Sequence, residues 1–177
     1  MGLKKNKVFC IGYPRTGTVS QTKALSQLGF KSWHFGRKYY NETFHALKTG
    51  QFDKNVLSKF DAFADVPIFF IYKELDKQWP DSKFVLITRE KNSWFGSMTH
   101  VMKLAKRRHK NNNKVNEFLW SNMYPEMIEE HTDKVKKYFS NRNDLFIKGI
   151  KEVDYDSLAS FLGVKTNKKG FPHLHRR

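Results

Sequence analysis

The chain has 177 residues and a formal net charge of +16, from 33 Lys and Arg against 17 Asp and Glu. No stretch of about 18 apolar residues occurs, which excludes a transmembrane helix, and a single cysteine excludes an internal disulfide framework. We therefore expect one cytoplasmic domain over residues 1–177, without a signal peptide, whose positive charge favours an anionic partner.

The first predicted elements are a strand, a tight loop and a helix. Residues 8–11 form a short apolar run, which predicts a buried strand. Glycine and proline then interrupt regular structure at Gly12, Pro14 and Gly17. From Thr18 the apolar residues recur at helical spacing, and Gly29 is the expected stop. Free N–H groups and the helix dipole would make this loop an anion cradle.

Strands and helices alternate along the rest of the chain. Further strands are predicted at residues 31–35, 60–64, 83–89 and 144–148. Further helices are predicted at 37–49, 67–79, 92–105, 124–138 and 155–162, the second starting at Pro67 and the third capped by Asn92. This alternation predicts an α/β fold, a three-layer P-loop-type parallel sheet flanked by helices.

Candidate binding residues fall at the carboxyl edge of this sheet. Ligands bind at that edge in parallel sheets, and Gly12, Asp65 and Arg89 each follow a predicted strand. Ser97 lies in the helix after Arg89, and a guanidinium fork with a hydroxyl suits a phosphate. The alternative is a surface arginine and a helix serine with no joint role.

The loop departs from the P-loop of nucleoside triphosphatases in two places. Gly12 and Gly17 have the spacing of G-x-x-x-x-G-K-[ST], but Thr18 replaces the lysine and Val19 replaces the magnesium-binding hydroxyl residue. The cationic side chain is Arg15, inside the loop. A magnesium–triphosphate site is therefore disfavoured, and a phosphosulfate without a metal fits better. An ordinary strand-to-helix turn is the alternative.

The stretch Gly12-Tyr13-Pro14-Arg15-Thr16-Gly17-Thr18 resembles the 5′-phosphosulfate loop of the sulfotransferase superfamily that depends on 3′-phosphoadenosine 5′-phosphosulfate. Its Arg-Thr-Gly-Thr version resembles a branch of small sulfotransferase-like proteins. The resemblance implies sulfuryl transfer to a hydroxyl or amine acceptor, with 3′,5′-adenosine bisphosphate as product and no metal. It also implies the residues that hold this cofactor: Gly12, Pro14, Arg15, Thr16, Gly17, Thr18, Val19, Ser20, Arg89 and Ser97.

The same resemblance gives catalytic roles to Asp65 and Arg15. Cytosolic sulfotransferases carry His-x-Pro where this chain has Asp65-Val66-Pro67, so Asp65 is the candidate base. Arg15 would stabilise charge on the leaving group. Asp65 is an adequate base where burial raises its pKa, and it is alternatively an N-cap for the helix starting at Pro67. His34 could face the cleft, although a structural role is the first interpretation, as it is for His131.

Two other functions stay open at this point. A P-loop nucleotide kinase would need the missing lysine and a magnesium ligand. A catalytically inactive basic protein that binds a nucleotide or nucleic acid would account for the net charge alone, although nucleic acid is not the favoured partner. The sequence identifies neither the acceptor nor the oligomeric state.

Overall fold

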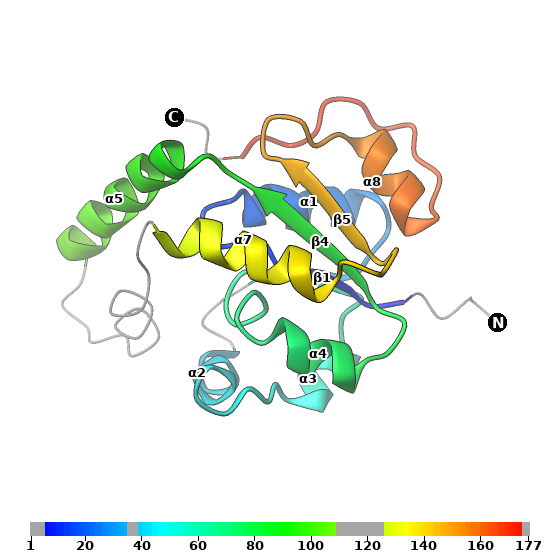
Figure 1. The fold of residues 1–177 in the computed structure, drawn as a ribbon, viewed down its shortest axis with the longest axis horizontal. Coiled ribbons are helices and arrows are strands. Elements are labelled where there is room, and N and C mark those ends of the chain that lie inside the picture. The colour runs from blue at the N-terminus through cyan, green and yellow to red at the C-terminus, as the bar shows by residue number, and fades with distance from the viewer. Residues whose placement is uncertain (1–5, 35–38, 109–125, 175–177) are drawn as a thin grey trace.

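Five parallel strands form the centre of the molecule (Figure 1). The computed structural model describes residues 6–34, 39–108 and 126–174. The strands lie in the order β2-β3-β1-β4-β5, and every neighbouring pair is parallel. Their bounds are β1 Val8–Cys10, β2 Ser32–His34, β3 Ala62–Ala64, β4 Lys83–Thr88 and β5 Leu145–Gly149. The predicted parallel α/β fold is confirmed.

Helices cover both faces of the sheet in the described part of the chain. They are α1 Thr18–Gln27, α2 Tyr40–Thr49, α3 Lys54–Ser58, α4 Tyr72–Gln78, α5 Lys91–Arg108, α7 Glu126–Tyr138 and α8 Tyr155–Leu162. Figure 1 shows α7 crossing in front of the sheet and α5 projecting away from it. None of the described helices is long and apolar enough to cross a membrane. Residues 35, 37–38 and 124–125, which belong to predicted elements, lie outside the described residues.

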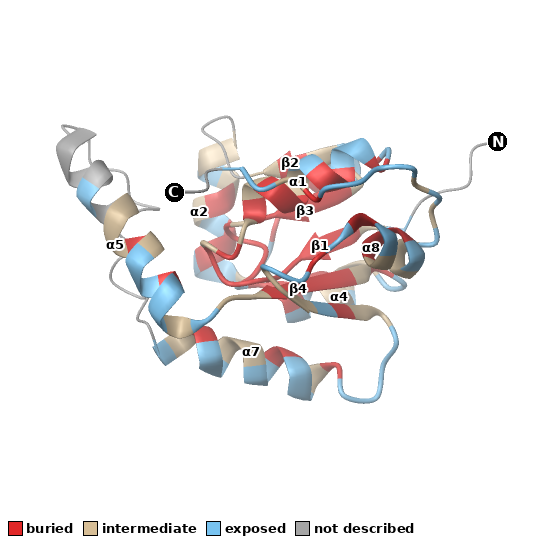
Figure 2. Ribbon diagram, turned by 90° about the horizontal axis from the view of Figure 1, so that it is seen from above, coloured by how far each residue is buried: buried red, intermediate tan, exposed pale blue. Residues whose placement is uncertain are grey.

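The core divides into layers because successive strand residues point to opposite faces of the sheet. Val8 and Cys10 pack with residues of α1 and α8 in one buried cluster. Phe9 and Ile11 pack in another, with residues of α3, α4 and α7. Figure 2 shows the buried residues concentrated along the strands, with exposed residues on the outer sides of α7 and α8. The three-layer arrangement follows directly from this alternation.

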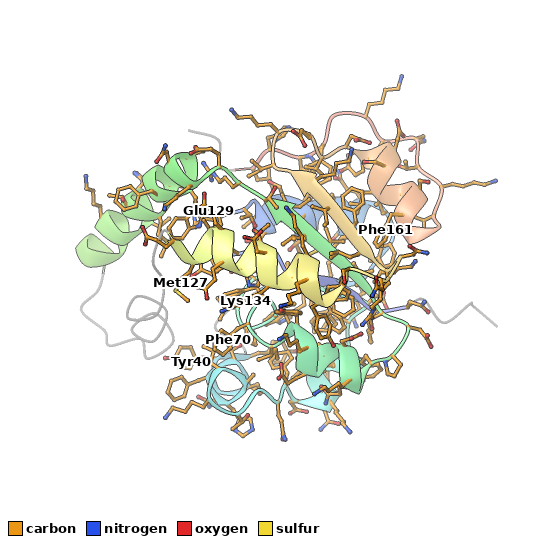
Figure 3. All side chains as sticks on the ribbon, in the orientation of Figure 1. Tyr40, Phe70, Met127, Glu129, Lys134 and Phe161 are labelled. Atoms are coloured by element: carbon orange, nitrogen blue, oxygen red, sulfur yellow. The ribbon has the colours of Figure 1, made fainter. Side chains whose placement is uncertain are left out.

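A third buried cluster lies next to the loop after β1. It contains Tyr13, Phe69, Trp94 and Met98, with Tyr40, Phe44 and Met127 packed against it. Figure 3 labels Tyr40, Met127 and the neighbouring Phe70, whose side chain is 49% exposed. Phe70 falls within the helix predicted over residues 67–79 and lies instead in the turn that precedes α4.

Two helix starts and one short helix differ from the predictions. The chain turns over residues 66–70 and α4 begins at Tyr72, not at Pro67. Val66, Ile68, Phe69 and Ile71 are all buried, and consecutive burial of this kind does not fit one face of a helix.

The predicted cap Asn92 lies inside α5. The Glu90 carboxylate accepts the backbone N–H groups of Asn92 and Ser93, each at 2.7 Å, so Glu90 is the N-cap. The short helix α3 was not predicted. Its N-cap Asp53 accepts the N–H of Asn55 at 2.7 Å, and five helical residues give too short a periodic signal.

Candidate functional site

The loop between β1 and α1 is closed by its own hydrogen bonds. Thr16 Oγ1 donates to the Tyr13 carbonyl at 2.7 Å, and the side chain of Gln21 donates to the Thr16 carbonyl at 3.0 Å. The Trp94 indole N–H donates to the Pro14 carbonyl at 2.6 Å and so ties the loop to α5. Pro14 and Thr16 are therefore buried supports of the loop, with their side chains turned into the protein.

Gly12 is required by the close approach of two backbones. A Cβ at this position would lie 2.6 Å from Thr16 Oγ1 and 2.7 Å from the Ile87 carbonyl oxygen of β4. Gly17 is required for a different reason, because its φ of 85° lies in the left-handed region that favours glycine. The two glycines of the predicted motif thus have separate steric causes.

The first turn of α1 faces the loop without a capping side chain. Its N-cap is Gly17, no side chain bonds the cap, and the first turn has no acidic residue. Such a helix start offers N–H donors and the positive end of the dipole to an anion. Thr18 is buried and Val19 half-buried in this turn. The Ser20 hydroxyl accepts the backbone N–H of Leu174 at 3.0 Å, a contact with the C-terminal segment that the sequence did not indicate.

Two arginines meet beside this helix start. Arg89 Nη1 donates to the Arg15 carbonyl at 2.9 Å, and Arg15 Nε donates to Ser97 Oγ at 3.2 Å. Arg89 Nε also donates to Ser93 Oγ at 3.0 Å. Burial and then the charge of Arg15 hold the pKa of Arg89 below its usual range. The positive charges of Arg15 and Arg89 repel each other, and a doubly charged anion between them would remove this repulsion. Paired guanidinium groups of this kind are suited to a phosphate.

Asp65 contacts the first residue of the same helix. Thr18 Oγ1 donates to Asp65 Oδ2 at 3.4 Å, and His34 Nε2 lies 3.1 Å from the same oxygen. Asp65 is not a helix cap, because α4 begins at Tyr72 and has Ile71 as its N-cap, so no helix starts at Pro67 for Asp65 to cap. The capping interpretation of Asp65 is wrong.

Backbone strain concentrates at this site. Three residues other than glycine have a positive φ in the described part of the chain, and two of them are Arg15 at 71° and Asp65 at 75°. Left-handed geometry costs a residue other than glycine about 1–3 kcal/mol and persists where the surrounding structure enforces it. Such strain is a feature of ligand-binding and catalytic positions. The two residues proposed for catalysis are thus held in unusual conformations at the carboxyl edge of the sheet.

His34 lies beside Asp65 at the carboxyl edge of the sheet, and His131 packs inside the protein as predicted. His34 ends β2 and pairs in register with Ala64 of β3, which sets it beside Asp65. Its position at the end of a strand was the available signal. His131 Nε2 bonds the Ile11 carbonyl at 2.7 Å, and burial lowers its pKa. It packs against the rings of Tyr13 and Tyr72, in the helix-packing role predicted for it.

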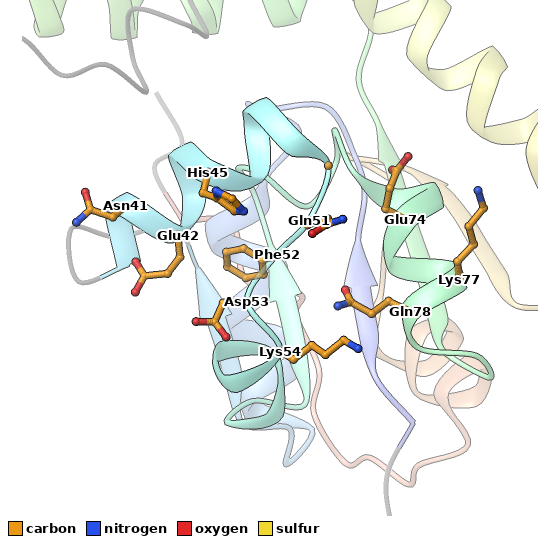
Figure 4. Close-up of a pocket in the computed structure, with 11 residues that line it drawn as sticks. Asn41, Glu42, His45, Gln51, Phe52, Asp53, Lys54, Glu74, Lys77 and Gln78 are labelled. Atoms are coloured by element: carbon orange, nitrogen blue, oxygen red, sulfur yellow. The ribbon is translucent and has the colours of Figure 1, made fainter.

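A separate pocket of about 890 Å³ lies between α2, α3 and α4 (Figure 4). Its walls include His45, Phe52 and Lys77 and contain none of the loop residues. Within the described ranges, no group of three or more His, Cys, Asp and Glu residues could hold a metal ion.

Comparison with known proteins gives a matching family, a related protein and a similar crystal structure. The family of the sulfotransferase domain matches residues 7–123. A relative from Aspergillus versicolor, Ava biosynthesis cluster protein M, is 26% identical over 216 residues, covering 95% of this chain and 80% of the relative. The crystal structure of a sulfotransferase from Alicyclobacillus acidocaldarius gives a TM-score of 0.61 at 16% identity, covering 99% of this chain and 87% of that one. The last similarity concerns the fold and agrees with the layers described above.

Proposed function

The chain belongs to the sulfotransferase domain family, and from this premise we propose that it transfers a sulfuryl group from 3′-phosphoadenosine 5′-phosphosulfate to a hydroxyl or amine acceptor. The observation that carries this proposal is the contact of Arg89 with the loop. Its guanidinium donates to the Arg15 carbonyl at 2.9 Å, so the two cations proposed for the two ends of the cofactor border one site.

The residues present fit the cofactor's charge. An uncapped helix start, two neighbouring guanidinium groups and the hydroxyls of Thr18 and Ser97 supply donors, and the first turn of α1 contributes no carboxylate. In this proposal the loop N–H groups and Thr18 hold the 5′-phosphosulfate. Arg89 and Ser97 hold the 3′-phosphate, for which a planar fork and a hydroxyl are suited.

The proposed chemistry assigns one task to each of two residues. Asp65 accepts the proton of the acceptor as the acceptor oxygen or nitrogen bonds the sulfur. Arg15 stabilises the negative charge that develops on the bridging oxygen as the bond from sulfur to that oxygen breaks. When bound, the cofactor supplies the activated sulfuryl group. The protein otherwise contributes position and a prearranged field, as in phosphoryl transfer.

Calorimetric titration with 3′,5′-adenosine bisphosphate tests the proposal. The wild type should bind, and Arg89→Ala should weaken binding about 10- to 150-fold, the range that corresponds to a lost charge-assisted bond. Arg89→Lys should fall between the two, because it keeps the charge and loses the fork. Lys23→Ala is the matched control, since Lys23 is an exposed cation of α1 whose loss should leave the affinity unchanged.

Two outcomes would overturn the proposal. One is a wild type that ignores the bisphosphate but binds generic DNA with a steep salt dependence, which would favour a nucleic-acid-binding protein. The other is magnesium-dependent turnover of ATP, which would favour a kinase.

A further inference from the structure

Three side chains from three elements meet at one carboxylate oxygen. His34 ends β2, Thr18 begins α1 and Asp65 follows β3. His34 Nε2 lies 3.1 Å from Asp65 Oδ2 and 3.2 Å from Thr18 Oγ1, and Thr18 Oγ1 donates to the same Oδ2 at 3.4 Å. The side chains of His34 and Asp65 are 26% and 19% exposed, so bulk water shields the triangle only in part.

The geometry fixes the direction of these bonds. A carboxylate oxygen accepts, so His34 must carry its proton on Nε2 to bond Asp65, whether the ring is neutral or charged. Both contacts reach Oδ2, which holds the plane of the carboxylate and leaves Oδ1 on the opposite side of Cγ. A base held in this way keeps one oxygen in place for its incoming proton.

Thr18 cannot hold Asp65 and the cofactor at the same time. Its hydroxyl carries one proton, which goes either to Asp65 Oδ2 or to an oxygen of the bound phosphosulfate. If the loop binds the cofactor, Asp65 loses the weaker of its two contacts, the one at 3.4 Å. The contact with His34 then remains to orient the carboxylate during the reaction.

We propose that His34 is a positioning residue, which orients the Asp65 carboxylate so that Oδ1 receives the acceptor proton. This inference rests on the proposed function. In the step it serves, the bond between the acceptor oxygen and sulfur forms and the acceptor proton moves to Asp65 Oδ1. The bond from sulfur to the bridging phosphate oxygen breaks, and its electron pair stays on that oxygen. His34 touches neither reacting group and acts through Asp65.

The test is a double-mutant cycle with consumption of 3′-phosphoadenosine 5′-phosphosulfate as readout. The acceptor is a simple aliphatic alcohol, or water where the alcohol is not accepted, because both keep their proton at neutral pH and need a base to remove it. His34→Ala should lower kcat about 10- to 100-fold, the scale of a misplaced catalytic group, with the KM for the cofactor unchanged. Asp65→Asn should lower kcat at least about 100-fold. The double variant should be no slower than Asp65→Asn alone, because His34 acts through that carboxylate.

Two further variants separate positioning from general damage. His34→Gln keeps an N–H donor at similar reach and should recover kcat to within about threefold of wild type. His45→Ala is the matched control, since His45 is exposed on α2 and should have no effect. Binding of 3′,5′-adenosine bisphosphate to His34→Ala should equal that to wild type, which shows that the fold and the cradle are intact.

Several outcomes would overturn the inference. These are full activity in His34→Ala, multiplicative losses in the double variant, or a His34→Gln variant as slow as His34→Ala. Failure of the proposed function is distinguishable, because the wild type itself would then neither bind the bisphosphate nor consume the cofactor. In that case His34 has no such reaction to serve.

Discussion

Replacing Gly12 by alanine should destabilise the protein by about 1–6 kcal/mol and weaken binding at the loop. The added Cβ would lie 2.6 Å from Thr16 Oγ1 and 2.7 Å from the Ile87 carbonyl oxygen, whereas ordinary contact begins near 3.4 Å. The loop and β4 must therefore separate by about 0.7 Å. The Ile87 carbonyl belongs to the backbone of a paired strand and cannot rotate away from the added Cβ, so the steric strain at this contact remains.

The magnitude follows from two costs and one gain. Turning the Thr16 hydroxyl aside breaks its bond to the Tyr13 carbonyl, which costs about 1–3 kcal/mol at a buried position. Overpacking against Ile87 costs about 1–3 kcal/mol more. The reduced entropy of the unfolded chain returns about 0.4–1 kcal/mol. The melting temperature should fall by about 2–4 °C per kcal/mol for a chain of this size.

Urea unfolding and calorimetric titration with 3′,5′-adenosine bisphosphate measure both effects. Gly96→Ala is the matched control, because Gly96 is exposed on α5 and a Cβ there meets nothing within 4 Å. That substitution should stabilise by about 0.5–1 kcal/mol and leave binding unchanged. If Gly12→Ala unfolds at the same urea concentration as wild type and binds equally well, the close approach of the loop and β4 does not constrain the site.

Three further predictions concern single side chains. Arg15→Ala should lower turnover about 100-fold or more with little change in melting temperature, whereas Arg15→Lys should retain activity. If Arg15→Ala turned over as fast as wild type, Arg15 would have no part in the mechanism. Hydrogen bonds from Arg142 hold the pKa of Asp76 below its ordinary 3.8, so the stability that they confer is present above pH 3.8 and is lost as the pH falls through the pKa of the folded state. In urea unfolding, Asp76→Asn should therefore lose less stability than wild type as the pH is lowered. An unchanged dependence of stability on acid pH would contradict this prediction. Burial lowers the pKa of His131 below 6.5, so the unfolded chain takes up a proton first and the free energy of unfolding decreases as the pH falls below about 6.5. His131→Gln should reduce this dependence of the unfolding free energy on pH between pH 7 and 5. An identical dependence in wild type and variant would assign it to other groups.

Local patterns were sufficient to predict most elements and the position of the loop. The run at residues 8–11, the glycines of the loop and the helix after Thr18 are short-range signals, and the structure has each within a residue or two. The meeting of Gly12, Asp65 and Arg89 at one edge followed from the parallel order of strands, which alternating elements predict. These features depend on neighbours in the sequence or on a general rule of topology.

What the sequence by itself determined is therefore the fold, the position of the loop between β1 and α1, and the residues at the carboxyl edge of the sheet. Tertiary structure alone decided that α4 begins at Tyr72, that Asp65 bonds Thr18 beside His34, and that Ser20 bonds the C-terminal segment. The physical reason differs between the two kinds of feature. The side-chain contacts join residues at least 16 positions apart in the sequence. The start of α4 depends on which apolar side chains the preceding turn buries. The spacing of residues along the sequence does not predict such contacts, because they form only once the sheet has brought the ends of its strands together.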